Sequence, residues 1–264
     1  MAERLFIVSK LLSAAGVVHG FSLRTGGVSP APFDSLNLGA SVGDAAESVE
    51  ENLRRLLEAA GVRGGLATAH QVHGDRVLGA SAGGVLHEIL PATEPQPEGA
   101  DAVVALDDGV AAGVRVADCV PLLLYAEDQG AAAAVHSGWR GTRLSIAARA
   151  VRALQHAAGA DPARILAAVG PCIGRCCYEV SPELASMFRG LFGPEAADDP
   201  AHRPKPHLDL RACVEGALQR AGVPAERIEQ VEGCTSCDMS AFFSHRRDKG
   251  RTGRHIAFVA AGAQ

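Results

Sequence analysis

The residues best suited to chemistry gather in one stretch of this sequence, from Arg115 to Thr142. A cysteine and a histidine there lie beside two apolar runs, residues 120–125 and 131–135, and a polar tetrad at 127–130 separates the runs. Apolar runs of this length around a turn signal predict the two strands of a hairpin. We therefore expect antiparallel pairing about a turn centred in the tetrad.

The register of this hairpin brings the two reactive side chains together. It sets Cys119 opposite Gly138 and His136 opposite Pro121. Residues that oppose one another share a face of the sheet, as do residues two apart on one strand. Cys119 and His136 are therefore expected to lie within reach of one small ion or one reacting atom. The alternative is a buried cysteine and a hydrogen-bonded histidine that meet by chance.

A predicted helix begins directly after the histidine. Residues 142–158 place apolar side chains at helical spacing, with Thr142 as N-cap and Gly159 as the stop. The first N–H groups of a helix lack intrahelical partners and form the positive end of its dipole. We expect an anion site, most suited to phosphate, where Arg140 and Gly141 enter this helix.

Arginines in loops are the expected partners of that anion, because a guanidinium matches phosphate oxygens bidentately. The arginines in Gly- or Ser-containing loops are Arg24, Arg140, Arg246 and Arg254. Arg24 or Arg246 is expected to share the phosphate with Arg140. The alternative for Arg140 is packing on Trp139 or pairing with Asp118.

Three residues have the chemistry of metal ligands, namely His73, Cys119 and His136. Two imidazoles and a thiolate suit zinc, and three protein ligands leave a fourth position for water or substrate. Their spacing matches no local zinc motif. Residues 66–77 have the pattern of a strand, whose alternation points His70 away from His73, so His70 is not expected to be a ligand.

The other cysteines are expected to be structural. Cys234 and Cys237 form a lone Cys-x-x-Cys, which without a second pair favours reduced structural thiols over a metal site. Cys172, Cys176 and Cys177 follow a Gly-Pro turn and are expected to be buried small side chains, with lining of a cavity as the alternative.

Composition bounds the class of protein. The chain has 264 residues, 47% of them hydrophobic, a net charge of −5 and 7 cysteines. These values allow one large core and give no support for nucleic-acid binding. No signal peptide or membrane-spanning run is evident, and the odd cysteine count favours a reducing compartment. We expect a cytoplasmic protein, without membrane or nucleic-acid partners, and favour a monomer.

The chain interleaves strands and helices without a repeat or a boundary, which predicts one α+β domain over residues 1–264. Asp44 and Glu47 predict a capping box for a helix. Residues 83–99, rich in Pro, Gly and Glu, are expected to be a surface loop. The other predicted elements are strands at 5–8, 17–23, 101–106, 165–169, 228–231 and 255–260 and helices after Ser181 and Asp209.

Six motifs taken together carry a resemblance that covers most of the chain. They are Arg24-Thr-Gly-Gly-Val-Ser, Gln71-Val-His-Gly, Ala117-Asp-Cys-Val-Pro, His136-Ser-Gly-Trp-Arg-Gly, Gly170-Pro-Cys-Ile-Gly with Cys177-Tyr-Glu-Val, and Phe243-Ser-His-Arg-Arg-Asp with Gly253-Arg254. In these the chain resembles the YfiH family, also described as a laccase-domain or polyphenol oxidase family, as purine nucleoside phosphorylases and as a peptidoglycan-editing factor. His245 departs from the aromatic residue expected there, which puts base stacking at that position in question.

The resemblance implies central, sandwich-like mixed β-sheets flanked by helices, and zinc on His73, Cys119 and His136. It also implies phosphorolysis of adenosine, inosine and methylthioadenosine, with deamination of adenosine, so that a nucleoside and phosphate are the partners. The expected catalytic residues are Cys119, His136, Asp118 and Arg140. The expected substrate- or phosphate-binding residues are Arg24, Arg140, Gly141, Thr142, Glu179 and Arg246.

Two alternative functions remain open from the sequence. A cysteine hydrolase that edits peptidoglycan precursors would use Cys119 as nucleophile and His136 as base, and metal content separates it from a zinc enzyme. A module that only binds a small molecule or partner is the third. Laccase activity is not expected, because a multicopper centre needs many histidines in His-x-His pairs, whereas no two of the 10 histidines here are separated by one residue.

Overall fold

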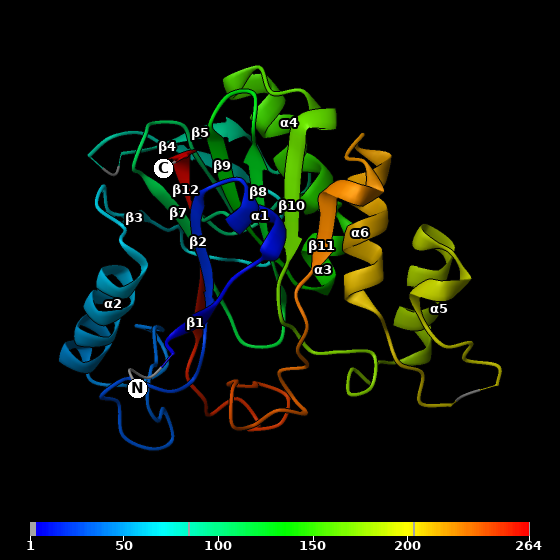
Figure 1. Ribbon diagram of the computed structural model, residues 1–264. Coiled ribbons are helices and arrows are strands. Elements are labelled where there is room, and N and C mark those ends of the chain that lie inside the picture. The colour runs from blue at the N-terminus through cyan, green and yellow to red at the C-terminus, as the bar shows by residue number, and fades with distance from the viewer. Residues whose placement is uncertain (1–3, 84, 203, 264) are drawn as a thin grey trace.

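Two mixed β-sheets pack face to face at the centre of the computed structural model, which describes residues 4–83, 85–202 and 204–263 (Figure 1). The strands are β1 (Phe6–Ile7), β2 (Val17–Ser22), β3 (Leu66–Ala67), β4 (Val77–Ala80), β5 (Leu86–Leu90), β6 (Ala102–Ala105), β7 (Ala111–Val116), β8 (Val120–Ala126), β9 (Ala131–Ser137), β10 (Ile165–Val169), β11 (Ile228–Gln230) and β12 (His255–Ala263). The five-stranded sheet has the order β1-β2-β12-β7-β3, and the seven-stranded sheet has the order β11-β10-β8-β9-β6-β4-β5.

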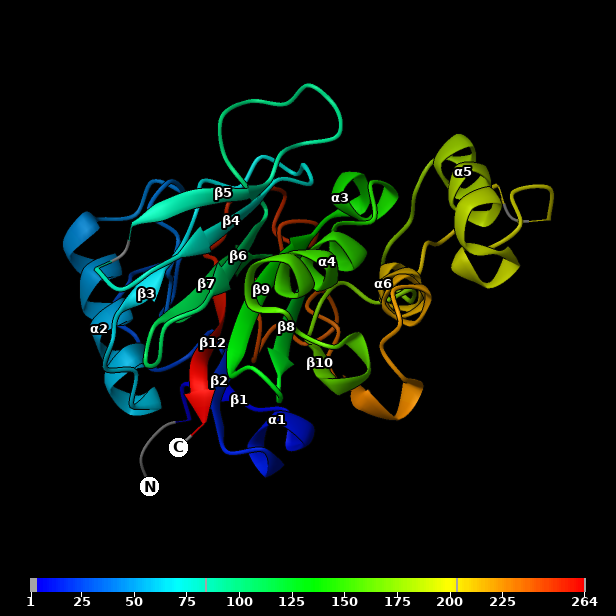
Figure 2. The same cartoon turned by 90° about the horizontal axis from the view of Figure 1, so that it is seen from above.

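Helices cover the outer face of each sheet. The α-helices are α1 (Lys10–Ala14), α2 (Ala46–Ala60), α3 (Trp139–Arg143), α4 (Ile146–Ala158), α5 (Pro182–Phe192) and α6 (Leu210–Arg220). Helix α2 lies outside the five-stranded sheet, and α4 and α6 lie outside the seven-stranded sheet, with α5 beyond α6 (Figure 2). The single α+β domain with sandwich-like sheets is thereby confirmed. Within the described ranges, no helix is both long and apolar enough to cross a membrane.

The central hairpin, β8 and β9, is buried on both faces, which explains why its sequence consists of two continuous apolar runs. Alternate residues of β8 face opposite layers, so that Leu122 and Leu124 pack toward α4 while Leu123 and Tyr125 pack toward the five-stranded sheet. A strand buried on both faces has no polar alternation. The register is as predicted, with Pro121 paired to His136.

The segment 83–99, predicted as a loop, contains the edge strand β5, which pairs with β4. An edge strand is half exposed, so its sequence carries polar residues and lacks the signal of a buried strand. The predicted strand over 66–77 is instead two short strands in different sheets, β3 and β4. The capping box is also wrong, because Asp44 accepts hydrogen bonds from Ser29 and Asn37, and Ala45 is the residue that precedes α2.

Candidate metal centre and ligand cavity

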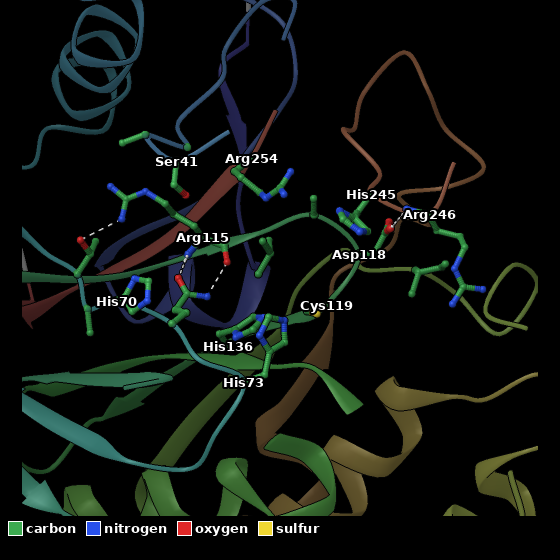
Figure 3. Close-up of a pocket in the computed structure, with 18 of the residues that line it drawn as sticks. Ser41, His70, His73, Arg115, Asp118, Cys119, His136, His245, Arg246 and Arg254 are labelled. Carbon is green, nitrogen blue, oxygen red and sulfur yellow. Dashed lines mark hydrogen bonds between the residues drawn. The ribbon is translucent and has the colours of Figure 1, made fainter. Parts of the chain in front are cut away.

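Three donor side chains converge where the two sheets open at one end (Figure 3). His73 comes from the connection between β3 and β4, Cys119 from the connection between β7 and β8, and His136 from β9. One ligand atom from each lies within 4.8 Å of the others. The structure thus brings together the three residues that the sequence predicts as metal ligands. His70 lines the same cavity but lies outside this group.

His73 reaches the group for a reason that strand alternation did not predict. It lies outside any strand and adopts a left-handed backbone conformation, with φ of 62°. Gly138 allows the close approach, because a Cβ atom there would lie 3.0 Å from Sγ of Cys119 and 3.1 Å from the His73 ring. A side chain at position 138 would therefore push two of the three donors apart.

A fully buried carboxylate, Asp101, holds both histidine-bearing segments. It accepts a hydrogen bond from Nδ1 of His136 at 2.7 Å, which leaves Nε2 of that ring free to bind a metal. It also accepts the backbone N–H groups of His73 at 3.0 Å and Gly74 at 2.7 Å. A carboxylate that orients a ligating imidazole is typical of metal sites. The sequence analysis missed Asp101, although an aspartate at the start of a buried strand is a usable signal.

The electrostatics of the group favour a thiolate. Burial opposes ionisation of Cys119, but the charge of His136 and hydrogen bonds from His136 and His73 outweigh it and lower the pKa of the thiol. Burial likewise lowers the pKa of His136, but the charge of Cys119 and the Asp101 hydrogen bond outweigh it, so that this pKa is raised. Since a thiolate is the form that binds metals, the donor set and its geometry fit an ion such as zinc.

Asp118, directly before Cys119, adopts a left-handed conformation with φ of 88°. Its carboxylate accepts the hydroxyl of Thr235 and the backbone N–H of Arg246, both at 2.6 Å. A non-glycine residue in this conformation needs such support from its surroundings. Asp118 therefore ties the cysteine-bearing connection to the segment between β11 and β12, and it does not bond either histidine.

The donors line a cavity of about 700 Å³, a size typical of small-molecule sites. Among the described residues, Asp118 is the one carboxylate in its lining, against three arginines, Arg115, Arg246 and Arg254. Tyr178 and His245 add flat rings to the wall. The cavity therefore suits an anionic or strongly polar ligand.

Two of these arginines have no carboxylate partner among the described residues. Nε and Nη1 of Arg115 donate to the Leu38 carbonyl and the Thr68 hydroxyl. Among the described residues, the guanidinium of Arg254 donates only from Nη1, to the carbonyls of Thr252 and Gly253. Both guanidinium groups keep N–H donors that no described protein atom accepts. Arg115 was not singled out from the sequence, because it lies inside a strand.

The predicted phosphate clamp at the helix start is not part of this cavity. Arg140 stacks on Trp139, with its guanidinium 4.6 Å from the ring centre, and lines another depression. The predicted helix is split by Ser145 into α3 and α4. The N–H of Thr142 already donates to the carbonyl of Gly138 at 2.8 Å, within α3. Gly141 is buried beside the Gly74 carbonyl, and neither Gly141 nor Thr142 lines the cavity.

Two other predicted binding residues lie outside the cavity lining. Arg24 pairs with Asp34 at 2.9 Å and lies over the Phe243 ring. The side chain of Glu179 is 3.7 Å from Lys205, and its backbone carbonyl accepts a hydrogen bond from Nη1 of Arg246 at 2.8 Å. Of the loop arginines named from the sequence, Arg246 and Arg254 line the cavity, whereas Arg24 and Arg140 do not.

Comparison with known proteins agrees with this architecture. The family model described as "Multi-copper polyphenol oxidoreductase laccase" matches residues 18–262. The chain is 37% identical to purine nucleoside phosphorylase YlmD of Geobacillus stearothermophilus over 93% of this chain and 90% of that protein. It is 34% identical to purine nucleoside phosphorylase YfiH of Escherichia coli over 96% and 97% of the two chains. The crystal structure of Bacillus licheniformis YfiH superposes with a TM-score of 0.83 at 31% identity, covering 93% of each chain.

Proposed function

We propose that this chain, which belongs to the YfiH family of laccase-domain proteins, is a zinc-dependent purine nucleoside phosphorylase that also deaminates adenosine. One observation carries the proposal: a His-Cys-His donor group lines the same cavity as two arginines that have no carboxylate partner within the described part of the chain. The names of these relatives supply the reaction class. The substrates we propose are adenosine, inosine and methylthioadenosine with inorganic phosphate.

Zinc is the metal we propose for the donor group. Two imidazoles and one thiolate in a three-residue set are typical of catalytic zinc, and all three donors line the cavity, so a substrate atom can take a fourth position. When bound, zinc would polarise an oxygen atom of the substrate or of water. Within the described residues, these are the only histidines that gather into a group of three or more donors, which argues against a multicopper centre.

Arg115 and Arg254 are the phosphate-binding residues in this proposal. Their free N–H groups match the oxygens of a phosphate, and burial removes competing water. Burial lowers the pKa of both guanidinium groups, and a bound anion would offset this cost of burying their charge. This choice replaces the clamp predicted at Arg140.

The remaining lining residues would position the nucleoside. Asp118 is the carboxylate available to hold a proton during deamination, since it lies next to Cys119 and lines the cavity. Tyr178, whose ring lies 5.0 Å from the Arg246 guanidinium, and His245 offer flat surfaces for a purine. A histidine in place of an aromatic residue at 245 still supplies a ring.

The test is turnover by the zinc-loaded protein. With phosphate, adenosine should give adenine and ribose 1-phosphate, and without phosphate it should give inosine and ammonia. Arg254→Ala should raise the KM for phosphate about ten- to a hundredfold, because a charge-assisted hydrogen bond contributes about 1.5–3 kcal/mol. Deamination consumes no phosphate and should change much less.

Arg140→Ala is the matched control, since it removes an arginine that lies near the donors in sequence but outside the cavity lining. It should keep the wild-type KM for phosphate. A zinc-loaded protein that turns over none of the proposed nucleosides would overturn the proposed function. A larger effect of Arg140→Ala than of Arg254→Ala would overturn the phosphate assignment alone.

A cysteine hydrolase is the second candidate, and one observation favours it. Cys119, His136 and Asp101 form a relay in which the imidazole contacts the thiol and the carboxylate, as in enzymes with a cysteine nucleophile. Iodoacetamide labelling separates the two candidates. If Cys119 of the purified protein holds zinc, it resists alkylation until a chelator is added, whereas a free nucleophile is alkylated at once.

A further inference from the structure

Two pairs of cysteines far apart in the sequence meet at the protein surface. One pair follows β10 and the other follows β11. These strands are parallel neighbours, so the chain leaves both of them at the same end of the sheet. The four residues, here named the cysteine cluster, are Cys176, Cys177, Cys234 and Cys237. Their sulfur atoms all lie within 4.8 Å of one another.

The spacing of these sulfur atoms suits ligands of one ion. Sγ of Cys176 lies 3.6 Å from that of Cys234 and 3.5 Å from that of Cys237, and the sulfurs of Cys177 and Cys237 are 3.3 Å apart. A disulfide needs about 2.05 Å. Four sulfurs in a tetrahedron around zinc, each at about 2.3 Å, are about 3.8 Å from one another. The observed separations are close to the tetrahedral value.

The backbone around the cluster is arranged for thiolates. The N–H of Gly174 donates to Sγ of Cys234 at 3.2 Å. A Cβ atom at Gly174 would lie 3.1 Å from Sγ of Cys176, so the absence of a side chain lets this amide approach the sulfurs. Hydrogen bonds of this kind support ligands of structural metals. Cys176 and Cys237 are exposed, which gives an ion access.

The sequence interpretation of Cys234 and Cys237 as metal-free thiols depended on the lack of a second pair. That premise was wrong, because the fold supplies the pair Cys176 and Cys177 from about 60 residues away in the chain. The expectation that all three cysteines after the Gly-Pro turn are buried holds only for Cys172.

We propose that the cysteine cluster binds one zinc ion through four thiolates. Four cysteines in a tetrahedron are a common ligand set of structural zinc, and a site with four protein ligands has no open position, so its role is structural. The ion would join two segments, residues 173–178 and 234–246, that both contribute to the cavity wall. Thr235, next to Cys234, donates a hydrogen bond to Asp118, the residue before Cys119. The cysteine cluster is therefore connected to the His-Cys-His group through this bond.

Zinc analysis of the intact chain tests this proposal without reference to enzymatic activity. The wild-type protein purified with zinc should hold two ions per chain. Cys119→Ala, which disrupts only the His-Cys-His group, should retain one ion, and its X-ray absorption spectrum should show four sulfur neighbours at about 2.3 Å. A single ion in the wild type that is lost in Cys119→Ala would overturn the proposal.

Removing the cluster gives the converse result. Cys234→Ser combined with Cys237→Ser should lower the content from two ions to one, whereas Cys213→Ala, which changes a buried cysteine of α6 outside both groups, should keep two. If the double variant does not fold, the spectrum of Cys119→Ala still decides. A disulfide among the four cysteines of the native protein, found by mass spectrometry, would also refute a four-thiolate site.

Discussion

Replacing Asp101 with asparagine tests whether one buried carboxylate holds both histidine donors in place. Its two oxygens accept the N–H groups of Val72, His73 and Gly74 and Nδ1 of His136, at distances from 2.7 to 3.2 Å. Asparagine keeps one acceptor oxygen and turns the other into an N–H donor that faces these donors. The His73 segment and the His136 ring should therefore lose their fixed positions.

The expected loss of zinc affinity is about ten- to a hundredfold, the usual effect of removing a partner that orients a metal ligand, or about 1.4–2.8 kcal/mol. This matches the loss of one charge-assisted hydrogen bond, about 1.5–3 kcal/mol. Asp101 also raises the pKa of His136, and the proton on that ring competes with zinc. In Asp101→Asn the proton competes less with zinc for His136, which offsets part of the lost affinity. The difference in zinc affinity between the variant and its parent should therefore be smallest near neutral pH and grow as the pH rises.

Chelator competition measures this zinc affinity. The Cys234→Ser, Cys237→Ser background is used so that only the His-Cys-His group binds zinc. Asp75→Asn is the matched control, because Asp75 is also fully buried but accepts from Thr93 and lies outside the donor group. It should destabilise the fold and leave zinc affinity unchanged. Equal affinities of folded Asp101→Asn and the parent protein would refute this account of Asp101.

Three further predictions concern protons and packing. In the Cys234→Ser, Cys237→Ser background, zinc binding to the His-Cys-His group should release about one proton from His136 at neutral pH. The raised pKa of His136 keeps the metal-free ring charged, while Cys119 is already a thiolate. Calorimetry in buffers of different ionisation enthalpy counts the released protons. Burial lowers the pKa of His255 to about 3, so below about pH 6.5 only the unfolded chain takes up this proton. The contribution of His255 to the free energy of unfolding should then fall as the pH drops from about 6.5, with a slope that approaches about 1.4 kcal/mol per pH unit near pH 5. His255→Gln should remove this share of the slope in denaturant titrations at each pH. Gly138→Ala should weaken zinc binding at least tenfold, because the new Cβ would lie against Cys119 and His73. In Gly190→Ala of α5 the new Cβ meets nothing within 4 Å, so this control should keep its metal and gain roughly 0.5–1 kcal/mol of stability.

Local sequence was sufficient for elements whose pairing is short in range. The turn between β8 and β9 fixes their register, and a side-chain period of two then places Cys119 and His136 on one face, as the structure confirms. The ends of α4 and α6 also follow from local signals, at Gly159 and Asp209. Each of these depends on residues within a few positions of one another.

Local sequence failed where the deciding partner lies in another element. The left-handed conformation of His73, which brings it to the other donors, is supported by hydrogen bonds to Asp101, 28 residues away. Edge strand β5 exists because β4 offers it a partner. Arg140 stacks on Trp139, which was the alternative expected from the sequence, and it lines a depression outside the cavity; only the packing around α3 decides this position.

The sequence by itself determined the family, the α+β class and the chemistry of the donors, because residue types and near-neighbour spacing carry that information. Only the tertiary structure decided which distant residues share a site. The pairing of Arg115 with Arg254 in one cavity, and of Cys176 with Cys237 in one cluster, depends on strand order. Strand order is set by burial of whole sheet faces, which no local periodicity specifies.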